Sequence, residues 1–210
     1  MKTTHGLAAG AALAVLTALL AACGGSPKPS STPAAQQSAA QQSTAPAAQQ
    51  SPEVNPAGDI PDDQVFVAYA SPSGIFSVKV PEGWARTTVG PATVFTDKLN
   101  SIRIESGPAA TEPTPASAAA TEVPALKAQT SGFTPGKVTI VRRKAGPAVE
   151  ITYKARSAPD PVTGKIVTDA TERYEFWKSG QKVVLTLSGP VGADNVDPWR
   201  IVTDSFGWRK

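Results

Sequence analysis

The alternation of apolar and polar side chains predicts β-strands early in the globular part of the chain. Phe76, Val78 and Val80 are separated by polar residues, and a period of two is typical of a strand with one buried face. The sequence Pro-Glu-Gly-Trp at 81–84 predicts the turn that ends this strand. Further strands are expected at 65–69 and, as a hairpin, at 92–95 and 101–105.

The C-terminal half predicts four longer strands, rich in β-branched and aromatic residues. They are expected at 137–143, 148–157, 166–177 and 182–188. A glycine lies in each of the three intervening turns. We expect the last three strands to pair as an antiparallel meander, because a short connection joins each to the next.

A helix is predicted between these two groups of strands. The Thr-Pro pair at 114–115 is typical of an N-cap followed by proline at the first helical position, so the helix is expected over 116–121. Pro124 interrupts the helical pattern. We therefore expect a break there, or a second start near Thr121 that runs to about Gln129.

A second helix is expected at 199–205, close to the C-terminus. Asp197 is the expected N-cap, with Pro198 at the first helical position. The apolar residues that recur at helical spacing and are expected to pack on the sheet are Trp199, Val202 and Phe206. Helices that cover an antiparallel sheet define an α+β domain.

Residues 1–22 have the pattern of an export signal. The apolar run at 7–20 follows the positive charge of Lys2, and it is short for about 30 Å of hydrocarbon. Leu20-Ala21-Ala22-Cys23 resembles the lipobox of bacterial lipoproteins, in which the cysteine just after the cleavage site offers its thiol for attachment of diacylglycerol. We therefore expect Cys23 to hold the protein in the bilayer, on the extracytoplasmic face of the bacterial cell membrane. An ordinary secretory signal and an uncleaved anchor are the alternatives.

Residues 23–60 are expected to form a disordered tether. They consist mostly of Pro, Ser, Thr, Ala and Gln and contain no aromatic residue, so they cannot bury enough apolar surface to offset the entropy of ordering. This composition also suits an O-glycosylated stalk. Residues 61–210 are long enough for one hydrophobic core, and we expect them to form the single globular domain.

Composition excludes several kinds of active site from residues 61–210. The one histidine, His5, and the one cysteine, Cys23, both lie before them. A Ser-His-Asp or Cys-His pair, a His/Cys zinc site and a disulfide are therefore excluded. The formal net charge is +3 and the basic residues are scattered, so we expect no nucleic-acid partner. We predict no catalytic residue, metal or cofactor, and expect that the protein is not an enzyme.

Carboxylates and tryptophans supply the remaining candidates. Oxygen donors suited to a hard cation such as calcium are Asp160, Asp169, Glu172, Asp194, Asn195 and Asp197. Helix capping by Asn195 or Asp197 explains the last three without a metal. The carboxylates available to a glycosidase-type pair, none singled out by its spacing, are Glu82, Glu105, Glu150 and Glu175. A possible aromatic binding patch, with core packing as the alternative, consists of Trp84, Trp177, Trp199 and Trp208.

Five segments resemble the PsbP-like family in order and spacing. They are 74–84, 172–177, 183–189, 193–199 and 204–208. This family includes extrinsic proteins of photosystem II, a Ran-binding protein of the Mog type and actinobacterial lipoproteins. The resemblance covers about 65–209 and implies an α/β/α sandwich with a central antiparallel sheet. It also implies docking onto larger assemblies. Metal binding by some photosynthetic members uses histidine and carboxylates, and this domain lacks the histidine.

These patterns together predict a lipid-anchored envelope lipoprotein whose domain is a non-enzymatic docking or accessory module for an envelope or membrane complex. A carrier of a lipid or small apolar ligand is the first alternative. An envelope hydrolase that relies on carboxylates is the second. A deep apolar cavity in the folded domain would favour the carrier, whereas an exposed patch on a solid core would favour docking.

Overall fold

The computed structural model describes residues 57–160 and 162–209. The predicted signal peptide, the lipidation site Cys23 and nearly all of the tether lie outside the described residues. The helices and strands are, in chain order, β1 (Phe66–Ala70), β2 (Phe76–Pro81), β3 (Ala85–Val89), β4 (Ala92–Asp97), β5 (Asn100–Pro108), α1 (Pro115–Gln129), β6 (Thr134–Arg143), β7 (Gly146–Arg156), β8 (Thr168–Lys178), β9 (Gln181–Pro190), α2 (Val196–Ser205) and β10 (Gly207–Trp208).

The strands form two antiparallel sheets. The larger sheet has seven strands in the order β3-β4-β5-β9-β8-β7-β6, and the smaller has the order β1-β2-β10. The expected meander of β7, β8 and β9 is confirmed. The pairing of β5 with β9 joins this meander to the early hairpin of β4 and β5. One continuous sheet therefore combines the two groups of strands that the sequence predicts.

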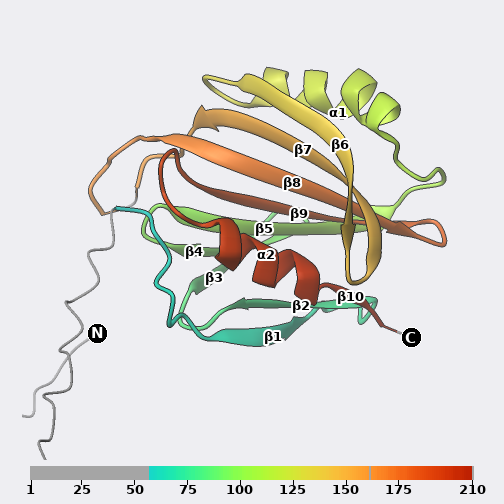
Figure 1. Cartoon of the computed structure of the whole chain (residues 1–210), viewed down its shortest axis with the longest axis horizontal. Coiled ribbons are helices and arrows are strands. Elements are labelled where there is room, and N and C mark those ends of the chain that lie inside the picture. Colours follow the sequence, from blue (N-terminus) through green and yellow to red (C-terminus); the bar gives the residue numbers. More distant parts are fainter. Residues whose placement is uncertain (1–56, 161, 210) are drawn as a thin grey trace, which may run out of the picture. The chain divides into compact units, whose positions relative to one another are not determined.

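Each face of the large sheet carries one helix (Figure 1). On one face α2 and the small sheet complete the larger core, in which Phe176 of β8 and Leu185 of β9 pack with Val202 of α2. On the other face Ala118 of α1 packs on Ile151 of β7 in a smaller core. Burial of each of the larger side chains, such as Phe176, Leu185 and Ile151, contributes about 1.5–3 kcal/mol. The predicted α+β class, with helices on both faces of an antiparallel sheet, is confirmed.

Helix α1 is continuous, so the expected break at Pro124 is wrong. Proline removes the hydrogen bond to the carbonyl four residues earlier, which here belongs to Ala120. Both Pro124 and Ala120 are exposed, so water can satisfy that carbonyl. The predicted cap is present, because the Thr114 side chain accepts a hydrogen bond from the Ser117 backbone N–H at 3.1 Å.

Helix α2 begins at Val196, so the expected N-cap Asp197 is one residue inside the helix. Asn195 occupies the N-cap position but makes no side-chain cap. Its amide is used elsewhere. Asn195 Oδ1 accepts a hydrogen bond from the Ile60 backbone N–H at 2.9 Å, and Nδ2 donates to the Gly58 carbonyl at 3.0 Å. A tertiary contact therefore replaces the local cap.

Strands β3 and β10 were not expected from the sequence pattern. All five residues of β3 are exposed. Because β3 buries no face, its sequence does not show the alternation of apolar and polar residues that predicts a strand. β10 is two residues long and pairs with β2 at Ser77 and Phe76. Both strands exist because a neighbouring strand presents unpaired backbone groups, a cause that local sequence does not carry.

A buried amide network fastens the start of the described chain to the rest of the domain. Asn100 Nδ2 donates to the Gly58 carbonyl at 2.8 Å, and Asn195 Nδ2 donates to Asn100 Oδ1 at 3.0 Å. Gly189 of β9 lies against this pair, and a Cβ there would approach Asn100 Oδ1 to 2.3 Å and Asn195 Nδ2 to 2.7 Å. The network therefore requires glycine at this position.

We expect Gly189→Ala to lower the free energy of unfolding by about 2–3 kcal/mol, because the methyl group displaces two buried amides. Gly107→Ala in β5 is the matched control, since a Cβ there meets no atom within 4 Å. Urea unfolding of the two variants measures the difference. Equal midpoints for both variants would contradict the account of the network.

Candidate functional site

One half of a sheet face is left without a helix. Antiparallel register places a row of side chains from β3, β4, β5 and β9 on the same side as α1. We call this row the open sheet face. It consists of Ala85, Thr87, Val94, Thr96, Ser101, Arg103, Thr186 and Ser188, all of them partly or fully exposed. The opposite side of the same strands is apolar and buried, as Phe95, Ile102 and Leu187 show.

The open sheet face exists because α1 packs over one end of the sheet. Figure 1 shows α1 along β6 and β7, away from β3 and β4. The apolar contacts of α1 are made by Ala118, Val123 and Leu126, which pack with Val149 and Ile151 of β7. The hydroxyl groups of Thr and Ser dominate the remaining half, so that half remains in water without loss of hydrophobic burial.

A cluster of six charged side chains lies beside α1 and includes Arg103 of the open sheet face. We call it the charged cluster, and it consists of Arg103, Glu105, Glu122, Arg173, Glu175 and Lys182. Its centre is Arg173 of β8, whose guanidinium lies 3.8 Å from Glu105, 3.3 Å from Glu122 and 3.4 Å from Glu175. Three carboxylates face three cations, so the cluster is neutral when fully ionised.

Glu122 is the residue of α1 that reaches this cluster. Its carboxylate accepts hydrogen bonds from Lys182 at 2.9 Å and from Arg173 at 3.3 Å. Burial alone would raise the pKa of Glu122, but Lys182 and Arg173 together lower it below the usual value. The ionised form of Glu122 therefore holds α1 on the sheet, in addition to the small apolar contact around Ala118.

Glu175 is the most deeply buried member of the charged cluster, with a side chain that is 1% exposed. Burial raises its pKa, while Lys182 and Arg173 act in the opposite direction. Beneath the first turns of α1, Glu175 lines a hollow of about 260 Å³ together with Glu122 and Lys182. Its carboxylate already lies within 4.0 Å of two cations, and we assign it a structural role.

A larger hollow, of about 740 Å³, lies at one end of the open sheet face. We call it the end hollow. Its floor is formed by Ala85, Thr96, Ser101, Ser188 and Asp169, one residue from each of five strands. Its walls are the turn at 97–100 and the segments 157–160 and 162–165, which include the apolar side chains of Leu99, Ala158, Pro159 and Val162. Segments far apart in sequence thus meet around one carboxylate.

That carboxylate, Asp169 of β8, is 8% exposed. Among the described residues it has no hydrogen-bond or ion-pair partner, and its Oδ1 is fully buried. Burial raises the pKa of Asp169 from 3.8 to about 6. An ionised carboxylate removed from water without a partner destabilises the fold. Asp169 is therefore the one buried acid of the described domain that has no cation within ion-pair distance.

The four tryptophans of the predicted aromatic patch do not come together. Trp199 is 6% exposed and belongs to the larger core, where Trp84 packs edge-on to it at 6.4 Å between ring centroids. Trp208 packs edge-on to Phe206 at 5.3 Å. Trp177 lies on the α1 side of the sheet, where its Nε1–H donates to the Ala109 carbonyl at 2.8 Å. A single patch of all four is ruled out, because strand alternation sends Trp177 to the other face.

The carboxylates weighed for metal binding or catalysis are also dispersed. Asp160 and Asp169 share the end hollow, but Glu172 accepts a hydrogen bond from Tyr174 and Asp194 lies at the start of α2. Within residues 57–160 and 162–209, no group of three or more acidic, histidine or cysteine side chains is placed to hold a metal ion. Of the glycosidase candidates, Glu105 and Glu175 come together, and both contact Arg173.

None of the helices described is long and apolar enough to cross a membrane.

Part of the site could be predicted from the sequence. Asp160 and Asp169 were candidates as oxygen donors, but nothing local marks Asp169 as buried, because its cover comes from segments before and after it. The charged cluster was missed, since its members come from β5, α1, β8 and β9 and share no spacing.

Neither the comparison with protein-family models nor the comparison with curated proteins finds a match. Solved structures do match. The cyanobacterial PsbP of Synechocystis is 12% identical over 72% of this chain and 98% of its own, with a TM-score of 0.49. The Ran-binding protein Mog1p of Saccharomyces cerevisiae is 10% identical over 69% and 95%, with a TM-score of 0.48. LpqN of Mycobacterium tuberculosis, involved in cell envelope biogenesis, is 14% identical over 71% and 93%, with a TM-score of 0.44.

A protein from Bacteroides thetaiotaomicron matches over only 48% of its own length. A PsbP and a Mog-type protein are thus among the solved structures that match, as the sequence resemblance led us to expect. At identities of 10–14% and TM-scores below 0.5, the likeness concerns the fold alone and adds nothing on function.

We expect Asp169→Asn to stabilise the domain at pH 7 by about 1–2 kcal/mol, after allowance for solvent screening. The pKa of Asp169 in the folded state, about 6, exceeds its usual 3.8. The stability that its protonated form contributes is thus complete below pH 3.8 and is lost as the pH rises through 6. Thermal unfolding of both proteins between pH 4 and pH 8 checks this. The stability gained by Asp169→Asn over the wild type must grow from pH 4 to about pH 6 and then level off.

Proposed function

We propose that this protein is an extracytoplasmic lipoprotein, acylated at Cys23, whose domain docks an envelope or membrane protein on the open sheet face. A tether formed by residues 23–60 would carry the domain away from the bilayer. No catalytic step is assigned to it. The sequence supports the anchor, since Cys23 ends a lipobox-like motif after an apolar run.

The observation that carries the docking proposal is the contrast between the two faces of β3, β4, β5 and β9. One face is buried in a solid core, and the other stays exposed and ends in the end hollow. Specific protein interfaces combine a broad accessible surface with a hollow that accepts an anchoring side chain. Thr, Ser, Arg103 and a buried carboxylate supply polar groups for such a contact.

A carrier of a small apolar ligand is the second candidate, favoured by the size of the end hollow. Its volume of about 740 Å³ lies within the range of small-molecule sites, about 300–1,000 Å³. Its floor, however, bears two serines, a threonine and Asp169. Polar groups of this kind exclude an apolar molecule unless it pairs with them. The hydrolase alternative has less support, because Glu105 and Glu175, the two candidate carboxylates that come together, both form ion pairs with Arg173.

The anchor is tested by Cys23→Ala in a strain that carries the full-length chain. We expect wild-type protein to incorporate labelled palmitate and to sediment with membranes. The variant must lose the label, because no other cysteine is present to accept the diacylglycerol thioether. The control is Ser26→Ala, three residues after Cys23. This variant must keep the palmitate label, because its cysteine is intact. Palmitate labelling of Cys23→Ala at the wild-type level would contradict the proposal.

Docking is tested by photo-crosslinking in intact cells. A benzophenone amino acid placed at Thr87 or Thr96 reports on the open sheet face, and the same amino acid at Val67 or Ile140 reports on other exposed strands. We expect one discrete cross-linked protein band from the first pair, at least about tenfold stronger than from the second. Equal labelling at all four positions, or none at the first two, would reject this docking surface.

A further inference from the structure

We propose that Asp169 receives a positively charged side chain, arginine or lysine, which the docked protein inserts into the end hollow. This inference rests on the docking function proposed above and names the chemistry of the partner at one point of the contact. It is carried by the isolation of Asp169, by the shape and lining of the end hollow, and by the charges around it.

The first argument is that Asp169 differs from Glu175, the other buried acid of the described domain. Glu175, Glu122 and Glu105 each lie within 4.0 Å of a guanidinium or ammonium group, and so does Asp204. Asp169 has no such neighbour among the described residues, although it is 8% exposed. Of the two buried acids, Glu175 has two cations within 4.0 Å and Asp169 has none, so a cation for Asp169 would come from outside the described domain.

The second argument is energetic. Burial without compensation disfavours the carboxylate, and the raised pKa of Asp169, about 6, reflects this cost. At pH 7 the group is nevertheless mostly ionised. A cation brought to it would form a charge-assisted hydrogen bond in a site that is already partly dehydrated. The interaction therefore recovers free energy that the isolated domain lacks.

The third argument is the lining of the end hollow. Its floor holds the carboxylate, whereas its walls include Leu99, Ala158, Pro159 and Val162. Lysine and arginine have the matching structure, because an aliphatic stem of several methylene groups ends in a charged head. The stem would pack on the apolar walls while the head pairs with Asp169. A short neutral side chain would leave both the walls and the carboxylate unsatisfied.

The hollow also favours a side chain over a free small cation. It is open towards the exposed half of the sheet, since Ala85, Thr96, Ser101 and Ser188 belong both to its floor and to the open sheet face. Small-molecule sites usually enclose about 70–90% of their ligand. A cation presented from a docked surface is enclosed by that surface, so the contact is complete only with a protein partner.

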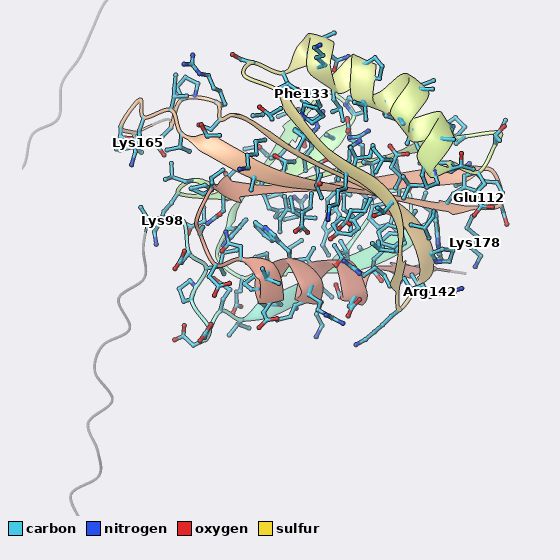
Figure 2. The ribbon with its side chains drawn as sticks, turned by 45° about the horizontal axis from the view of Figure 1, so that its top comes forward. Lys98, Glu112, Phe133, Arg142, Lys165 and Lys178 are labelled. Carbon is cyan, nitrogen blue, oxygen red and sulfur yellow. The ribbon has the colours of Figure 1, made fainter. Side chains whose placement is uncertain are left out.

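The charged groups that face Asp169 are those of the rim and of the neighbouring strand. Lys98 and Lys165 lie at the same end of the sheet (Figure 2). Lys98 lies 3.9 Å from Asp97, and Asp160 accepts a hydrogen bond from the Thr163 backbone N–H at 2.7 Å.

Tyr153 is a titratable group on the neighbouring strand β7, and burial, with a smaller effect of Asp169, raises the pKa of its phenol. It is therefore neutral at pH 7. Within the end hollow, three carboxylates (Asp97, Asp160 and Asp169) then face the ammonium groups of Lys98 and Lys165, which leaves a net charge of −1 for an incoming cation.

The direct test measures the carboxyl pKa of Asp169 by carbon-13 NMR on full-length protein in detergent micelles. The probe is the peptide acetyl-Gly-Arg-Gly-amide, and its control carries citrulline, a neutral isostere, in place of arginine. We expect the arginine peptide to lower the pKa of Asp169 by at least about one unit, equivalent to tenfold tighter binding to the ionised form. The citrulline peptide must leave it unchanged.

Two variants complete this test. Asp169→Asn should weaken binding of the arginine peptide at least about tenfold, whereas Asp160→Asn, on the rim of the same hollow, should change it less than twofold. An Asp169 pKa at or below 4 in the free protein would overturn the inference, because a rim lysine would then already be its partner. An unchanged pKa at 50 mM arginine peptide, or equal losses in the two variants, would also overturn it.

Photo-crosslinking from Thr87 separates this inference from the docking proposal. If Asp169→Asn abolishes the cross-linked band while Asp160→Asn retains it, both stand. If the band persists at full strength in Asp169→Asn, docking stands and the role of Asp169 is wrong. If wild-type protein gives no band, the docking proposal fails, whereas the NMR titration still decides whether Asp169 binds a cation.

Discussion

Strand β8 carries the constraint on which the rest of this domain depends. Its side chains alternate between two chemistries, with Tyr174 and Phe176 on one side and Arg173 and Glu175 on the other. Because neighbouring strands are in register, the two chemistries extend across the sheet. One face can then be buried completely under α2 and the small sheet. The other has enough apolar surface only at β7, and there α1 packs.

The consequence is a face that is assembled in three parts. An apolar contact holds α1 at one end, ion pairs through Glu122 and Arg173 continue the attachment, and hydroxyl groups occupy the remainder. From the apolar contact to the ion pairs and then to the hydroxyl groups, the side chains become more polar and can remain in contact with water. The open sheet face is therefore a direct result of how little hydrophobic surface the chain provides on that side, and it leaves polar side chains available to another molecule.

Much of the fold is readable from local pattern, and the reasons for the exceptions are physical. Strands β7, β8 and β9 were predicted because each buries a face, as Ile151 and Leu185 show, whereas β6 was predicted from its β-branched residues although none of its side chains is buried. Strand β3 escaped because none of its residues is buried. The break expected at Pro124 does not occur, and Ala120, whose carbonyl loses its hydrogen-bond donor, is exposed, so water can satisfy it. Local rules fail where water or a distant strand satisfies the backbone.

The site was less accessible to sequence reasoning than the fold. Asp169 could be named as an acid, but its burial depends on the turn at 97–100 and the segments beside Asp160, which fold over it from different parts of the chain. The charged cluster likewise joins β5, α1, β8 and β9. Spacing along the sequence cannot predict contacts between elements so far apart. The four tryptophans, which the sequence analysis grouped as one patch, are in fact separated, because Trp177 lies on the α1 side of β8 and Trp199 lies in the larger core.

The amide network of Gly58, Asn100 and Asn195 has a mechanical meaning as well. A pull exerted on the chain from its N-terminal side reaches the domain at residues 58–60, where hydrogen bonds connect to Asn100 of β5 and to Asn195, the residue just before α2. The force is thereby shared between the large sheet and a helix packed into the larger core, so neither has to peel away alone. A tether attached at this point can therefore bear tension. The end hollow, whose wall includes Asn100, would keep its shape under such a load.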